Sequence, residues 1–101
     1  MTNIFHAQCT TLEAALRSLP YVSFVDALPT QTKPDETTIV LDTHSELLTL
    51  SHLCEILGLI REHLGDQKFF DIEVGRSTVC ISGIKSVPKL NLGQVYATKG
   101  T

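Results

Sequence analysis

Leucine and isoleucine recur at alternating intervals of three and four residues between positions 50 and 64. This spacing places them along one side of an α-helix. The segment Thr43-His44-Ser45-Glu46 just before it has the pattern of a capping box, and Gly65 stands where glycine often ends a helix. The sequence therefore predicts a helix over 45–64, with a main apolar stripe of Leu50, Leu53, Cys54, Leu57, Ile60 and Leu64.

A second helical pattern lies near the start of the chain. Thr10-Thr11-Leu12-Glu13 again resembles a capping box, and apolar residues follow at helical spacing up to Leu19. Pro20 cannot continue such a helix, so we predict a helix over 11–19. The preceding segment, 4–9, is predicted to be a short strand that leads into this helix.

The remaining apolar segments have the composition or the alternation of β-strands. Residues 21–28 and 37–42 are rich in β-branched or aromatic side chains, and a loop with two prolines separates them. Phe70, Ile72 and Val74 alternate with acidic residues, which is typical of a half-buried strand. A turn at Gly75-Arg76 would join it to a strand over 77–82, and 94–97 would add an edge strand.

The predicted order of elements is β-α-β-β-α-β-β in a single domain spanning residues 1–101. Two helices on one face of a mostly antiparallel sheet would cover the apolar sides of both layers. We therefore expect an α+β two-layer sandwich, with the ferredoxin-like βαββαβ arrangement as the leading topology. This fold serves many unrelated activities, so it says little about function.

Composition and charge favour a folded domain and disfavour nucleic-acid binding. Hydrophobic residues make up 43% of the chain and charged residues 19%, which favours a folded globular domain. The net charge of −3 has the wrong sign for a protein that binds phosphate backbones, and Asp71 and Glu73 follow Phe69 and Phe70 where an RNA-binding sheet would need basic neighbours. We expect no nucleic acid partner.

The apolar segments and the cysteines bear on where in the cell the protein is expected. Polar and charged residues interrupt the segment 47–64, and the first residues lack the pattern of a secretion signal. The three cysteines have no motif-like spacing, as expected in a reducing environment. We therefore expect a cytoplasmic protein without a membrane partner.

The histidines and cysteines do not form a recognisable metal or catalytic motif. His52 and His63 would share one side of the long helix, but eleven residues separate them by roughly 16 Å along its axis. One metal ion cannot bridge that distance. A nucleophilic Cys9 assisted by His6 or His44 is an alternative that no known pattern supports, and a metal carrier that uses Cys9, Cys54 or the histidines is a third hypothesis. We predict no metal, no cofactor and no catalytic residue.

The junction between the strand over 37–42 and the long helix offers an alternative function. Backbone N–H groups and the helix dipole favour anions at such a position, and His44 could donate a proton. A small enzyme or an anion- or metabolite-binding domain would use this site. Helix capping explains the same residues without a ligand: Asp42, Thr43, His44, Ser45 and Glu46.

The long helix carries more apolar surface than one sheet face usually covers. Ile56 and Leu59 widen its stripe, and His52 and His63 lie on the same flank. A wide apolar face indicates contact with another protein or a sister subunit, although packing by the N-terminal segment would also cover it. Our leading hypothesis is a non-catalytic protein-binding domain, either an adaptor, an inhibitor, an immunity-type protein or a regulatory protein.

Overall fold

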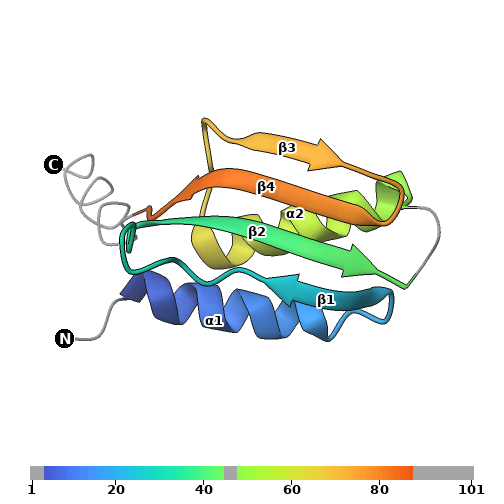
Figure 1. The fold of residues 1–101 in the computed structure, drawn as a ribbon, viewed down its shortest axis with the longest axis horizontal. Helices are drawn as coiled ribbons and strands as arrows, with labels where there is room; N and C mark the ends of the chain where they lie inside the picture. Colours follow the sequence, from blue (N-terminus) through green and yellow to red (C-terminus); the bar gives the residue numbers. More distant parts are fainter. Residues whose placement is uncertain (1–3, 45–47, 88–101) are drawn as a thin grey trace, which may run out of the picture.

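The computed structural model describes residues 4–44 and 48–87, which form two helices and four strands (Figure 1). The strands form one antiparallel sheet in the order β1-β2-β4-β3, so that β1 and β3 are its edges. In chain order the elements are α1 (Ile4–Arg17), β1 (Val22–Asp26), β2 (Glu36–Thr43), α2 (Leu50–Leu64), β3 (Asp71–Val74) and β4 (Thr78–Lys85).

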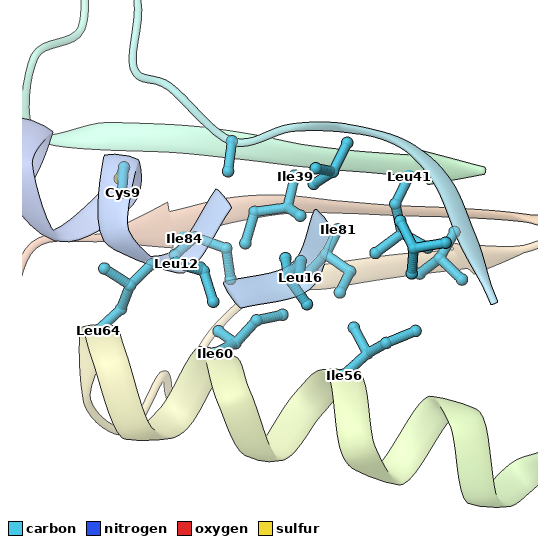
Figure 2. Packing of buried hydrophobic residues seen from close by; sticks show 14 of the residues in the cluster. Cys9, Leu12, Leu16, Ile39, Leu41, Ile56, Ile60, Leu64, Ile81 and Ile84 are labelled. Carbon is cyan, nitrogen blue, oxygen red and sulfur yellow. The ribbon is translucent and has the colours of Figure 1, made fainter. Parts of the chain in front are cut away.

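Both helices pack on the same face of the sheet. The buried residues of β2 alternate with more exposed ones, as expected for a strand with one covered face. Figure 2 shows side chains of the two helices directed towards those of β2 and β4. The core residues labelled there are Cys9, Leu12 and Leu16 of α1, Ile56, Ile60 and Leu64 of α2, and Ile39, Leu41, Ile81 and Ile84 of the sheet.

The predicted class, α+β with two helices on an antiparallel sheet, is confirmed. The described elements follow the order αββαββ. The ferredoxin-like arrangement is tested only in part, because the predicted strand over 94–97 lies outside the described residues. No helix in the ranges 4–44 and 48–87 is long and apolar enough to cross a membrane.

The predicted strand over 4–9 is wrong, because these residues form the first half of α1. Phe5 and Cys9 extend the buried stripe of Leu12 and Leu16 backwards at helical spacing, so the segment gains burial as a helix. The predicted capping box lies inside the helix. Its Thr10 hydroxyl donates to the carbonyl oxygen of His6, one turn earlier, at 2.9 Å.

The long helix begins later than predicted and ends where predicted. Thr49 is its N-cap, and the Thr49 Oγ1 atom accepts a hydrogen bond from the His52 N–H at 3.1 Å. Thr43 instead ends β2. At the other end Gly65 has a φ of 84°, which favours glycine, and its N–H donates to the Arg61 carbonyl oxygen at 2.8 Å.

Candidate functional site

The two flanks of α2 meet different neighbours. Its central stripe of Ile56, Ile60 and Leu64 is buried in the core. On one flank, His63 lines a shallow hollow together with Ala7, Gln8 and Thr11 of α1. On the opposite flank, Leu57 and Arg61 line a second hollow together with Phe70, next to β3. The first flank is therefore covered by α1, and the second faces the edge of the sheet.

The predicted partner-binding residues lie in the centre of α2 and on the flank towards α1. Ile56 is completely buried, so its side chain has no surface left for a partner in this fold. Leu59 is half-buried and packs against the core. His63 places Nδ1 2.9 Å from the Leu59 carbonyl oxygen, and His52 stacks on Tyr21 with ring centroids 3.9 Å apart. The wide apolar arc is thus largely used within the chain.

The contact between Tyr21 and α2 joins three polar groups. The Tyr21 hydroxyl donates to Glu55 Oε1 at 2.6 Å, while the stacked His52 has a buried Nδ1 atom without a hydrogen-bond partner among the described residues. Burial raises the pKa of the Tyr21 phenol above its ordinary value, and the hydrogen bond and charge of Glu55 raise it further. The phenol stays protonated at neutral pH and holds the first turns of α2 against the segment after α1.

The structure describes three of the five residues predicted at the strand–helix junction, namely Asp42, Thr43 and His44. Thr43 faces the core, and its hydroxyl donates to the Ser77 carbonyl oxygen at 3.3 Å, whereas its neighbour Asp42 faces the open side of the sheet. The exposed His44 donates its backbone N–H to the Tyr21 carbonyl oxygen at 2.8 Å. The N-cap of α2 is Thr49, so Thr43 does not cap this helix. The other two predicted residues, Ser45 and Glu46, lie outside the described residues.

The three cysteines are all free, and they differ in burial. Cys9 is buried in α1, and burial, followed by the charge of Glu13, raises the pKa of its thiol to about 12. A thiol with such a pKa is almost wholly protonated at neutral pH and is a poor nucleophile. Cys54 is exposed and Cys80 is half-buried; both are free, and no three described residues could hold a metal ion together.

Several exposed apolar side chains lie in or next to β3. In Figure 1, α2 crosses behind β2 and β4, whereas β3 lies beyond it at the edge of the sheet. Ile72 and Val74 point to the helix side of the sheet. Because α2 does not cover this edge, their side chains remain 38% and 50% exposed. Phe70, just before the strand, is 40% exposed, and Leu50 in the first turn of α2 is 80% exposed.

Between α2 and the segment before β3 lies a hollow of about 150 Å³, which Leu57 and Phe70 line and which reaches the core residues Ile60, Ile81 and Ile84. We use the name β3 groove for this hollow together with the exposed apolar side chains on the same elements, which are Leu50 and Cys54 of α2 and Ile72 and Val74 of β3. An ion pair between Arg61 Nε and Asp66 Oδ1, 2.8 Å apart, closes one end.

The local sequence pattern could not reveal this site. The alternation over 70–74 predicts a strand with one buried face, but it does not say whether that strand is central or at an edge. One signal was present: Leu50 and Leu57 widen the apolar stripe of α2 on the flank opposite to Leu59.

Comparison of the chain with protein-family models, with curated proteins and with solved structures finds no match.

Proposed function

We propose that this protein is a non-catalytic protein-binding domain and that its partner binds at the β3 groove. The observation that carries the proposal is the exposure of helix-facing apolar side chains on an edge strand. Side chains such as Ile72 and Val74 normally belong to the core of a two-layer domain, and here their covering layer is missing from the described residues. Contiguous apolar surface of this kind is typical of protein interaction sites.

The form of the groove favours a protein over a small molecule. The volume of its hollow, about 150 Å³, is smaller than the roughly 300–1,000 Å³ of typical ligand pockets, and it suits one or two side chains. The charged groups at its end, Arg61 and Asp66, already pair with each other. An adaptor, an inhibitor, an immunity-type protein and a regulatory protein would all use such a surface, so the proposal names the shared activity, which is binding.

The proposal is tested by affinity purification from the native host, followed by mass spectrometry, with two matched variants. Ile72→Asp places a charge in the groove, and Phe24→Asp places one on the opposite edge strand, where Phe24 is 50% exposed on the open face. We expect at least one stoichiometric partner to be lost from Ile72→Asp and retained by Phe24→Asp. A partner set that is the same for the parent chain and for Ile72→Asp would refute the proposal.

A further inference from the structure

We propose that the free edge of β3 binds an extended segment of another protein by strand addition, and that this segment alternates large apolar residues with lysine or arginine. The inference rests on the proposed function and adds the chemistry of the partner.

The backbone of β3 presents a free hydrogen-bonding edge. The Gly75 N–H donates to the Thr78 carbonyl oxygen at 2.8 Å, which makes this pair a hydrogen-bonded one. Such pairs alternate along an antiparallel ladder, so Glu73 and Asp71 direct their backbone groups to β4. The N–H and C=O groups of Ile72 and Val74 then point away from β4, and no strand within 4–44 or 48–87 pairs with them. A peptide strand added to a sheet edge binds to groups of this kind.

The side chains of β3 define what each face of the added strand must carry. Ile72 and Val74 pair with Ile81 and Val79, which are core residues, so they lie on the helix side. The residues of a partner on this side would lie over the β3 groove and would need to be large and apolar. Asp71 and Glu73 project to the open face. Residues of the added strand that lie opposite Asp71 and Glu73 would stabilise the pairing if they carry a positive charge.

The two carboxylates are available for such contacts. Neither Asp71 nor Glu73 forms an ion pair with another described residue, whereas the nearby Arg61 is engaged by Asp66. Asp26 and Asp42 also face the open side, on β1 and β2, which adds negative charge to that face. Charge complementarity therefore favours a basic partner strand.

The same two residues disfavour a second copy of this chain as the occupant. In a symmetric antiparallel pair of β3 strands, directly opposed residues must share a face of the sheet. If Ile72 pairs with Ile72 of the second copy, Asp71 opposes Glu73 on both sides; the neighbouring register opposes Glu73 to Glu73. Either register sets carboxylates against each other, which is destabilising. The edge is therefore suited to a different chain.

The test uses the full chain and two synthetic peptides that alternate valine with either lysine or glutamate, each flanked by glycine and serine. We expect the lysine peptide to bind at least about tenfold more tightly than the glutamate peptide, and less tightly as salt is raised. Hydrogen exchange measured by NMR should show new protection of the Ile72 and Val74 amides. Protection of these two amides distinguishes strand addition from contact through side chains alone.

Two variants separate the backbone from the charges. Val74→Pro removes an outward N–H without removing a bond to β4, a position that an edge strand tolerates, and it should abolish binding of the lysine peptide. The double variant Asp71→Lys, Glu73→Lys should prefer the glutamate peptide. Equal binding of both peptides to the parent chain, or an unchanged preference in the double variant, overturns the proposal.

Two results for the chain without peptide would also overturn it. Protection of the Ile72 and Val74 amides that rises with protein concentration would identify a second copy as the occupant. Protection that is independent of concentration would identify another segment of the same chain. If the native partner is lost from Ile72→Asp but retained by the double lysine variant, the proposed function stands and this inference fails.

Discussion

Replacing Ile56 by alanine tests how α2 is oriented on the sheet. Ile56 is completely buried between the helix layer and the sheet, and the substitution removes three carbon groups. At about 0.8 kcal/mol for each buried methylene, the lost burial amounts to roughly 2.4 kcal/mol. The cavity left behind adds to this, and losses on substituting buried isoleucine by alanine reach about 2–5 kcal/mol. We expect the free energy of unfolding to fall by about 3–4 kcal/mol.

The matched control is Leu50→Ala on the same helix. Leu50 is 80% exposed, so its truncation should change stability by less than about 0.5 kcal/mol. Urea titration followed by far-UV circular dichroism suits this chain, which has no tryptophan to report unfolding by fluorescence. The Ile56→Ala variant should also melt at least about 12 °C below the parent, given a shift of about 4–8 °C per kcal/mol for a domain of this size.

A loss below about 1 kcal/mol for Ile56→Ala, or an equal loss for Leu50→Ala, would refute this orientation of α2. The helix would then present its Leu50 side to the sheet, and Ile56 would again be a candidate for partner contact.

Three further predictions follow from single residues. Because the pKa of Tyr21 is raised in the fold, the contribution of its phenol to stability should be complete below about pH 10 and lost as pH rises through the folded pKa. In a Tyr96→Phe variant, absorbance at 295 nm should show that Tyr21 titrates at higher pH in the folded protein than in the protein unfolded by urea. Iodoacetamide at pH 8 should label the exposed Cys54 rapidly and the buried Cys9 only on unfolding, as measured by mass spectrometry; early labelling of Cys9 would contradict its burial. Gly65→Ala should destabilise by about 1–3 kcal/mol because of its positive φ, whereas Gly58→Ala, with open space at its Cβ position, should stabilise by roughly 0.5–1 kcal/mol; denaturation curves that move in the same direction would contradict this pair.

Local patterns predicted the elements whose burial and termination are determined within a few residues. The alternation over 70–74 gave β3, and Gly65 gave the end of α2, since a positive φ there suits glycine. They failed where tertiary contacts decided between alternatives. A short apolar segment such as 4–9 is compatible with either a strand or a helix, and packing of Phe5 and Cys9 selected the helix. Thr43 fits a helix cap, yet pairing with Val22 of β1 and a backbone hydrogen bond to the Ser77 carbonyl oxygen keep it in the sheet.

The candidate site was only partly predictable for the same reason. The sequence predicted that α2 has more apolar surface than the sheet needs, and it assigned the excess to the flank of Leu59, which faces α1. The excess that stays exposed lies at Leu50, on the other flank. Which flank remains uncovered depends on the strand order β1-β2-β4-β3, and that order is fixed by long-range pairing. No pattern within α2 contains this information.

The two acidic side chains of β3 also bear on the colloidal behaviour of the protein. No other strand of the described residues pairs with the outer edge of β3, and an unpaired edge with apolar residues beside it is a template for growth into fibrils. Carboxylates at every second position of β3 would be brought into line in an in-register stack, which makes growth of the first layers costly. We therefore expect the two carboxylates to oppose fibril growth along this edge at high protein concentration. The double variant Asp71→Asn, Glu73→Gln removes both charges, so it should form fibrils more readily than the parent chain.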